Sequence, residues 1–336
     1  MTNEKVQYRN LGRTGVKVSP LCLGTMNFGV RTPEAEAAEI INHYIEAGHN
    51  FIDTANLYGR FNGKGKVGWS EEIIGNTLSA NGKRGRIILA TKVWGHMDPE
   101  DPNARGLSRK HIITSCKASL KRLQTKYIDL YQLHRPVLDI PIDETLRALD
   151  DLIRRGWVRY IGTSMFPTWR IMEGLWVSEK YHLNRFVSEQ PRYNIYDREI
   201  EREIVSMAQE YNIAILPFSP LGGGILTGKY RKGEPFPEDS RLTFDDLGSY
   251  YVNALNKKFY ELLDILKEIS NEKGCTISQL SLAWVITQPG ITSVIIGPRT
   301  MEQLEGYLDA LNVTLTEKDY QRIDSMTIPG SNIENF

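Results

Sequence analysis

The stretch from residue 86 to residue 134 decides the fold, because RIILATK (86–92) and YIDLYQLH (127–134) flank a helical pattern. Both runs are short and almost continuously apolar, which is typical of strands buried on both faces of a parallel sheet. Between them, SRKHIITSCKASLKRLQ begins at a capping residue, Ser108, and ends in a cationic turn, as many helices do. Strand, helix and strand in this order predict a parallel βαβ unit.

The same rhythm extends along the chain in both directions. Six further strand-like runs complete a set of eight: SPLCLG (19–24), NFIDTA (50–55), VRYIGTS (158–164), RFVSEQ (185–190), IAILPFS (213–219) and TSVIIG (292–297). Helical patterns lie between them and begin at predicted caps such as Thr32 and Ser70. Eight βα units in 336 residues predict an α/β fold of the (β/α)8 TIM-barrel type. The rival, a doubly wound sheet, would need G-x-G-x-x-G where LGTMNFG stands.

The remaining residues are expected at the two ends of the barrel. VQYRNLGRTGVKVS (6–19) predicts an N-terminal hairpin that closes the bottom. Extended loops at 59–69, 95–108 and 230–250, with the C-terminal tail, are expected at the C-terminal face, where they would set substrate specificity. Because neither a linker nor a repeat beyond the βα rhythm interrupts the pattern, residues 1–336 are predicted to form a single domain.

Composition narrows the class of protein. The chain has 41% hydrophobic and 24% charged residues and a formal net charge of zero, as expected of a soluble globular protein without a general grip on nucleic acid or anionic membranes. The polar N-terminus does not resemble a signal peptide, and no apolar run reaches the roughly 18 residues of a membrane helix. The isolated Cys22, Cys116 and Cys275 predict neither a disulfide framework nor a metal site. We therefore expect a cytoplasmic location.

Four polar residues follow successive predicted strands: Asp53 and Tyr58 after the second, Lys92 after the third and His134 after the fourth. The carboxyl ends of parallel barrel strands converge on one mouth, so these side chains are expected to meet. A lysine beside a tyrosine favours the phenolate, and lowering the phenol pKa by two or three units needs roughly 3–4 kcal/mol. Asp53 would hold Lys92, and His134 would orient a substrate oxygen. Together they predict a device that protonates a carbonyl oxygen.

The loops after the seventh and eighth predicted strands favour an anion. In IAILPFSPLGGGILTGKY, glycines let backbone N–H groups approach phosphate oxygens, and Phe218 offers a flat face for a cofactor ring. Gly223 to Lys229 matches G-x-x-x-x-G-K, but Tyr230 replaces the Ser or Thr of an ATPase loop, which favours a diphosphate cradle instead. Thr300 is predicted to cap the next helix, where Arg299 and Gln303 would flank an anion.

These pieces resemble the aldo-keto reductase superfamily over nearly the whole chain. The matching segments are NLGRTGVKVSPLCLGTMNFG, FIDTANLYG, SEEIIG, LATKV, SLKRLQTKYIDLYQLHRP, IGTS, FVSEQPRYN, FSPLGGGILTGKY and IIGPRTMEQL. Some phrases, such as VRYIGTSMFPTWRIMEGLWVSE, also resemble bacterial nucleotide-sugar ketoreductases, and the barrel is similar to potassium-channel β subunits. The resemblance implies a (β/α)8 barrel that binds NADPH or NADP+ without metal and reduces aldehydes and ketones.

The resemblance also implies roles for individual residues. Its catalytic tetrad falls on Asp53, Tyr58, Lys92 and His134. Its cofactor contacts fall on Thr25, Asp53, Ser164, Gln190, Phe218, Ser219, Leu221, Gly223, Lys229, Gly297, Arg299 and Gln303. Departures from the family pattern are Met165 in place of Asn, Gly306 and Tyr307 in place of Glu-Asn, and the lengthened loop RFNGKGKVGW after Tyr58.

The expected activity is NADPH-dependent reduction of a small-molecule carbonyl compound, with Tyr58 as general acid. Two alternatives remain: a cofactor-sensing regulatory subunit with little turnover, and a Schiff-base lyase that uses Lys92. The sequence identifies neither the substrate nor the oligomeric state, and a homo-oligomer is one of the open alternatives.

Overall fold

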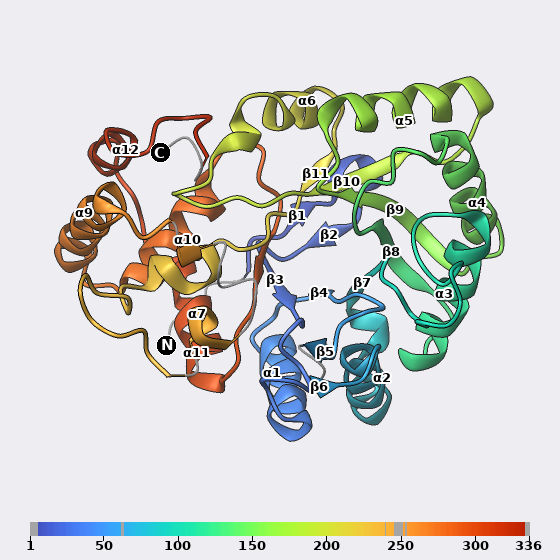
Figure 1. Ribbon diagram of the computed structural model, residues 1–336, viewed down its shortest axis with the longest axis horizontal. Coiled ribbons are helices and arrows are strands. Elements are labelled where there is room, and N and C mark those ends of the chain that lie inside the picture. Colours follow the sequence, from blue (N-terminus) through green and yellow to red (C-terminus); the bar gives the residue numbers. More distant parts are fainter. Residues whose placement is uncertain (1–5, 62–63, 239, 245–250, 253, 333–336) are drawn as a thin grey trace.

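Eight parallel strands form one curved sheet whose two edges meet (Figure 1). A computed structural model describes residues 6–61, 64–238, 240–244, 251–252 and 254–332. The strand order is β11-β10-β9-β8-β7-β4-β3-β12. The Thr292 amide donates to the Ile215 carbonyl at 2.9 Å, and the Ile295 amide donates to the Pro217 carbonyl at 2.9 Å. These bonds join the eighth strand to the seventh, so the predicted (β/α)8 barrel is confirmed.

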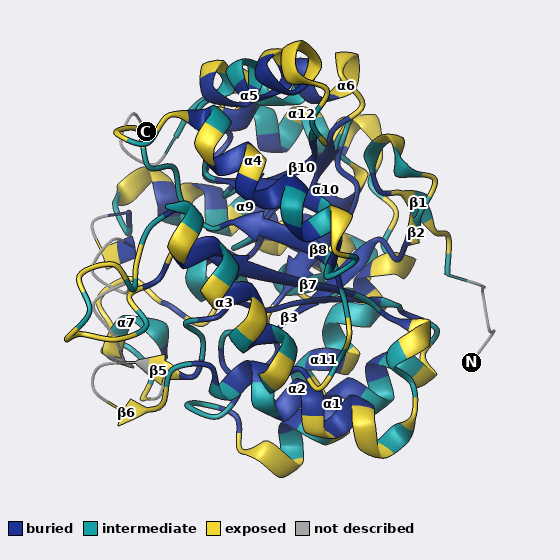
Figure 2. Ribbon diagram, turned by 90° about the vertical axis from the view of Figure 1, so that its right-hand side faces the viewer, coloured by how far each residue is buried: buried dark blue, intermediate teal, exposed yellow. Residues whose placement is uncertain are grey.

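All eight strand-like runs of the sequence contain a strand of the barrel. The strands are β3 (Leu21–Gly24), β4 (Phe51–Asp53), β7 (Ile88–Val93), β8 (Ile128–Leu133), β9 (Val158–Ser164), β10 (Phe186–Gln190), β11 (Ala214–Ile215) and β12 (Val294–Ile296). Their apolar residues face both the helices and the barrel interior, which explains why the runs do not alternate. Figure 2 shows these strands as a buried centre surrounded by helices that expose their outer faces.

Most of the helices cover the outside of the barrel (Figure 2). The described helices are α1 (Glu34–Glu46), α2 (Trp69–Asn81), α3 (Arg109–Arg122), α4 (Ile142–Arg154), α5 (Thr168–Tyr181), α6 (Ile204–Glu210), α7 (Arg241–Phe244), α9 (Lys257–Lys273), α10 (Ile277–Thr287), α11 (Met301–Leu308) and α12 (Glu317–Asp324). The short α7 belongs to the loop after β11. Within the described residues, no helix combines the length and apolar character needed to cross a membrane.

Two of the four predicted caps are wrong, and both residues have other partners. Helix α1 is preceded by Pro33, because the Thr32 hydroxyl donates to the Arg299 carbonyl at 3.1 Å. Helix α2 already begins at Trp69, and the buried Ser70 hydroxyl donates to the Thr25 carbonyl at 2.9 Å. Tertiary contacts thus recruit these hydroxyls away from the local role that their positions suggested.

The other two caps are confirmed. Ser108 accepts a hydrogen bond from the His111 amide, and Thr300 accepts one from the Gln303 amide. Both hydroxyls satisfy an amide of the first helical turn that would otherwise lack a partner inside the helix.

An antiparallel hairpin, β1 (Arg9–Asn10) and β2 (Lys17–Val18), closes the bottom of the barrel as predicted. Leu11 and Val18 are fully buried and pack in the barrel interior against a cluster that includes Phe51 and Leu130. The Arg9 guanidinium donates to the carbonyls of Ile286 and Ile291 at 3.0 and 2.9 Å. The hairpin therefore shields one end of the interior from water.

The opposite end carries the loops that follow the strands. The loop after β4 forms a small hairpin, β5 (Arg60–Phe61) and β6 (Lys64–Gly65). Figure 2 shows β5, β6 and α7 on one side of the molecule and β1 and β2 on the other. Of the loops expected to contact substrate, residues 62–63, 239 and 245–250, with tail residues 333–336, lie outside the described residues.

The fit of the hairpin can be tested at Gly12, in the 3-10 turn η1 (Gly12–Thr14). Gly12 has a φ of +53°, and a Cβ atom there would lie 2.7 Å from the Val187 and Asn212 carbonyl oxygens. Gly15 has a φ of +75° with open space around it, so it is a matched control. We expect Gly15→Ala to destabilise by about 1 kcal/mol and Gly12→Ala by about 2–4 kcal/mol in urea unfolding. Equal losses would contradict the tight contact.

Candidate active site

Lys92 and Asp53 form a buried ion pair at the carboxyl ends of β7 and β4. Lys92 is fully buried, and its Nζ contacts the Asp53 carboxylate and donates to the Thr54 carbonyl at 2.9 Å. The same Nζ lies 3.5 Å from the Tyr58 hydroxyl and 5.0 Å from the centre of its ring. The expected meeting of acid, ammonium and phenol therefore occurs in the folded chain. Tyr58 itself stays partly exposed, so a substrate can reach it.

The second oxygen of Asp53 is held by two glutamines. Gln132 Nε2 donates to Asp53 Oδ1 at 2.9 Å, and Gln190 Nε2 donates to it at 3.0 Å. Gln132 was missed by the sequence reasoning. Its signal was available, because residues two apart on a strand share a face and Gln132 precedes the inward-facing His134 by two. Together these bonds satisfy a carboxylate that would otherwise be costly to bury.

His134 lies beside Tyr58 and has one free ring nitrogen. The two rings are 5.7 Å apart at an interplanar angle of 79°. Its Nδ1 is buried without a hydrogen-bond partner among the described residues. Burial, followed by the charges of Lys92 and Arg135, holds the pKa of His134 well below its usual value. The imidazole is therefore neutral near pH 7 and can donate only one hydrogen bond.

Lys92 acts to lower the phenol pKa as expected, but the net lowering that the sequence predicted is wrong. Burial raises the pKa of Tyr58 by more than the neighbouring Lys92 ammonium lowers it. Burial also acts to lower the pKa of Lys92, but Asp53 and Tyr58 together raise it above its usual value. The phenol thus keeps its proton because burial is the dominant effect, and the ammonium keeps its charge because Asp53 and Tyr58 outweigh burial.

Three of the predicted cofactor residues surround this network. The Thr25 hydroxyl donates to the Asp53 carbonyl at 3.0 Å, which links the ends of β3 and β4. The Ser164 hydroxyl donates to the Gln190 carbonyl at 2.9 Å, which links the ends of β9 and β10. Ser164 and Gln190 therefore lie together at the mouth. Gln190 bonds Asp53 directly, and Ser164 is connected to Asp53 through Gln190.

The loop after β11 has the backbone that its glycines suggested. Ser219 has a φ of +54°, and Gly222, Gly223 and Gly224 all have positive φ within η4 (Gly222–Thr227). The Ser219 carbonyl accepts a hydrogen bond from the Asn194 side chain at 3.1 Å. Phe218 is partly buried ahead of this turn, and Leu221 is buried within it. The amides of Gly222 and Gly224 already donate to the Ser219 and Leu221 carbonyls at 2.9 and 2.8 Å, so an anion here would have to use other donors of the loop and the cations beside it.

Four cations gather beside this loop, and two of them were not predicted. Partial desolvation, followed by the charges of Arg299, Arg31 and Arg241, lowers the pKa of Lys229 to about 8, although solvent still reaches its side chain. The sequence singled out Lys229 and Arg299 alone, because Arg31 and Arg241 lie far from both along the chain. A concentration of positive charge of this kind attracts a multivalent anion.

Arg299 is held in place through its backbone. Its amide donates to Gln303 Oε1 at 2.9 Å, and its carbonyl accepts from Thr32 at 3.1 Å. The neighbouring Gly297 carbonyl accepts from the Asn27 side chain at 3.1 Å. Gln303 thus serves first to fix Arg299, which is a role that the sequence did not suggest.

Glu189 is a buried carboxyl group behind Ser164 and Gln190. Its Oε1 accepts from the Phe166 amide at 3.2 Å, and its Oε2 has no partner among the described residues. It supports the turn at Met165, whose φ of +57° is unusual for a residue with a side chain. Burial raises the pKa of Glu189 to about 8. The group is therefore mostly neutral near pH 7.

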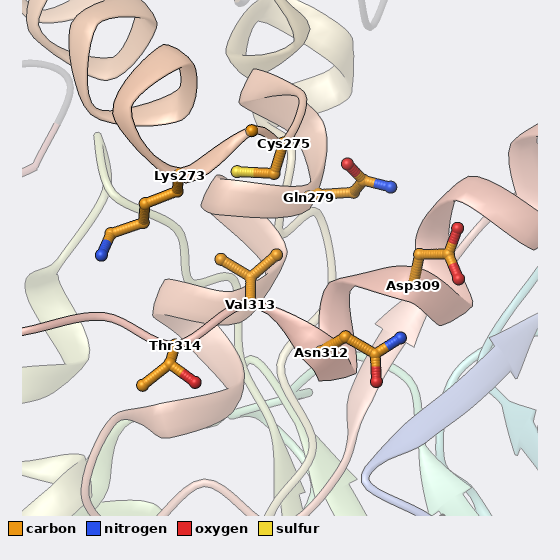
Figure 3. A pocket seen from close by; sticks show the side chains of 8 residues that line it. Lys273, Cys275, Gln279, Asp309, Asn312, Val313 and Thr314 are labelled. Carbon is orange, nitrogen blue, oxygen red and sulfur yellow. The ribbon is translucent and has the colours of Figure 1, made fainter. Parts of the chain in front are cut away.

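A cavity of about 450 Å³ lies away from this mouth. It lies between the end of α9 and the 3-10 turn η5 (Asp309–Asn312) and is lined by Lys273, Cys275, Gln279 and Asn312 among others (Figure 3). None of its residues belongs to the four-residue network or to the cation cluster.

The raised pKa of Glu189 predicts a dependence of stability on pH. An unfolded glutamate ionises near 4.5, so its stabilising contribution is complete below that pH and is lost as pH rises through about 8. Between pH 5.5 and 8.5, the free energy of unfolding of the unaltered protein should fall by roughly 2–4 kcal/mol because of this group. We expect Glu189→Gln, which cannot ionise, to lack this fall when urea unfolding is measured across the same pH range. The exposed Glu210→Gln is the control, and an identical pH dependence in both variants would refute the assignment.

Comparison with known proteins agrees with this geometry. The aldo/keto reductase family model matches residues 20–328. An uncharacterised oxidoreductase, YrpG, of Bacillus subtilis (strain 168) is 38% identical over 97% of both chains. Probable voltage-gated potassium channel β subunits of Arabidopsis thaliana and Oryza sativa subsp. japonica are 37% and 35% identical, over 92% and 96% of both chains. With its closed barrel and the polar network at the mouth, the chain belongs to the aldo/keto reductase family.

Proposed function

We propose that this protein is an NADPH-dependent reductase of aldehydes or ketones. The observation that carries the proposal is the buried Lys92–Asp53 pair, which brings an ammonium within 3.5 Å of the partly exposed Tyr58 hydroxyl. Family membership supports oxidoreductase chemistry, and the cation cluster beside the loop after β11 supports a phosphorylated cofactor. When bound, the dinucleotide would supply hydride to the carbonyl carbon.

In this proposal, the protein's own task is to deliver a proton to the carbonyl oxygen. Tyr58 holds its proton in the resting site, because burial raises the pKa of the phenol. As negative charge develops on the substrate oxygen, Tyr58 gives up the proton, and Lys92 stabilises the phenolate left behind. His134, kept neutral by burial, donates a hydrogen bond to the same oxygen and orients the carbonyl group.

Asp53 and its two glutamines act through Lys92. The carboxylate keeps the ammonium charged and fixes its position, and Gln132 and Gln190 fix the carboxylate. This chain of contacts is rigid because every member is buried, so little reorganisation is needed when the proton moves.

The cation cluster supports the 2′-phosphorylated form of the cofactor. Arg299, Arg31 and Arg241 lie close enough to Lys229 to lower its pKa, and a phosphate monoester would bring two negative charges to this group of cations. The glycine-rich turn of η4 lies next to Lys229, so the diphosphate and the additional phosphate would share this side of the mouth. NADH lacks the additional phosphate and would not make this interaction.

Replacing Tyr58 with Phe tests the general acid. We expect Tyr58→Phe to lower kcat by about 10²-fold or more while NADPH still quenches protein fluorescence, because the ring remains and only the acid is lost. The assay is oxidation of NADPH with a panel of aldehydes, diketones and sugar ketones. Tyr131→Phe is the control, since its buried hydroxyl donates to the Ile112 carbonyl away from the mouth. Full activity in Tyr58→Phe would exclude this role.

Replacing Arg299 with Ala tests the choice of cofactor. We expect the Kd of NADPH to rise by about tenfold or more and that of NADH to change much less, because only NADPH carries the phosphate that the guanidinium would bind. Fluorescence titration measures both constants. If both cofactors lose affinity equally, Arg299 does not recognise the 2′-phosphate.

A cofactor-sensing regulatory subunit is the second candidate. The two plant relatives named as probable potassium channel β subunits favour it, because each matches nearly the whole chain. The substrate panel separates the candidates, since tight NADPH binding without turnover of any carbonyl compound would support the regulatory role.

A further inference from the structure

A second cationic site lies at the opposite end of the barrel from the tetrad. A pocket of about 310 Å³ is lined by Arg13, Thr14, Ile153, Arg159, Tyr160, Ile161, Asn184, Arg185 and Val187. Arg159 stands near the start of β9 and Ser164 at its end, so about 16 Å of strand separates this pocket from the mouth. No aspartate or glutamate contributes to the lining, which gives the pocket three positive charges and no negative one.

The fold itself brings these arginines together. Arg13 is on the η1 turn, which rests on β10 because Gly12 lies against the Val187 carbonyl. Arg185 immediately precedes β10, and Arg159 is on the neighbouring strand β9. The hairpin that closes the barrel therefore holds Arg13 against two arginines from strand ends. They are distant in sequence and meet only when the bottom is closed.

None of the three guanidinium groups forms an ion pair with a carboxylate in the described part of the chain. Arg159 lies over the Tyr127 ring at 4.6 Å, and Arg185 donates through Nη2 to the Tyr211 carbonyl at 2.8 Å. Arg185 Nε is buried and has no hydrogen-bond partner among those residues. A buried donor without an acceptor is costly, so this arginine is not fully satisfied by the fold.

The like charges are close enough to influence one another. Burial, followed by the charge of Arg13, lowers the pKa of Arg185, and the exposed Glu179 offsets only part of this effect. Nearby Arg84, by contrast, is paired with Asp129 at 2.8 Å. The chain thus neutralises one arginine of this face and leaves three facing a common space.

We propose that this pocket binds a small organic phosphate or diphosphate. Guanidinium groups bind phosphate oxygens through paired N–H donors, which a cluster of arginines offers from several directions. Ile153, Ile161 and Val187 provide an apolar wall for the organic part, and Tyr160 a ring beside it. Because Arg13 belongs to the β1–β2 hairpin, the bound ligand would also link that hairpin to β9 and β10.

Titration calorimetry with pyrophosphate tests the site. We expect Arg13→Ala and Arg185→Ala to weaken binding by about tenfold or more, and Arg13→Lys by less, because lysine keeps the charge but loses the paired donors. Arg86→Ala is the matched control, since Arg86 is an exposed arginine in the 3-10 turn η2 (Arg84–Arg86), ahead of β7 and outside the pocket. It should bind pyrophosphate like the unaltered protein.

The mouth must be distinguished from the bottom, because both carry cations. Arg299→Ala removes a charge from the mouth and should leave the pyrophosphate affinity of the bottom pocket unchanged. Loss of binding in Arg299→Ala without loss in Arg13→Ala would overturn the proposal, as would the absence of pyrophosphate binding at millimolar concentration. Arg13 is exposed on a turn, so Arg13→Ala is expected to fold even if Arg185→Ala does not.

Discussion

The buried ion pair between Lys92 and Asp53 is the interaction on which the rest of the site depends. Burying two charges costs several kcal/mol per ion unless each also has hydrogen-bond partners. Here Thr54, Gln132 and Gln190 supply them from three further positions of the barrel. The pair therefore requires β4, β7, β8 and β10 to end at the same level, which only a closed barrel of parallel strands provides. The pair also holds the charged Lys92 ammonium beside Tyr58, in a buried position that excludes water.

Zero net charge conceals a strongly uneven distribution of charge. Lys92 is neutralised by Asp53, and Arg84 by Asp129, whereas three arginines lower the pKa of Lys229 and Arg13 lowers the pKa of Arg185. Such concentrations of like charge lower the stability of the empty protein and raise its affinity for anions. The two clusters lie at opposite ends of the barrel. The proposed cofactor site and the proposed phosphate pocket thus both concentrate positive charge that favours an anion. The length of the strands separates the two sites.

The eight strands and the hairpin were predictable because their signals are local and repeated. Each run is short and apolar and is followed by a helical or loop pattern, and each such signal can be recognised without knowledge of its neighbours. The caps at Thr32 and Ser70 were wrong for the opposite reason: their hydroxyls have better partners in Arg299 and Thr25. The lowered pKa expected for Tyr58 failed similarly, since it considered the lysine charge and not the desolvation of the phenol.

The sequence by itself determined which residues stand at the ends of which strands, and therefore that Asp53, Tyr58, Lys92 and His134 share one mouth. It did so because parallel strands align their carboxyl ends whatever lies between them. Only the tertiary structure decided which groups Asp53 contacts, that Arg31 and Arg241 join Lys229, and that Arg13 meets Arg159 and Arg185. Those outcomes depend on distances across the barrel and on burial. No periodicity in the chain encodes either, because the strands involved are brought together only by closure of the sheet.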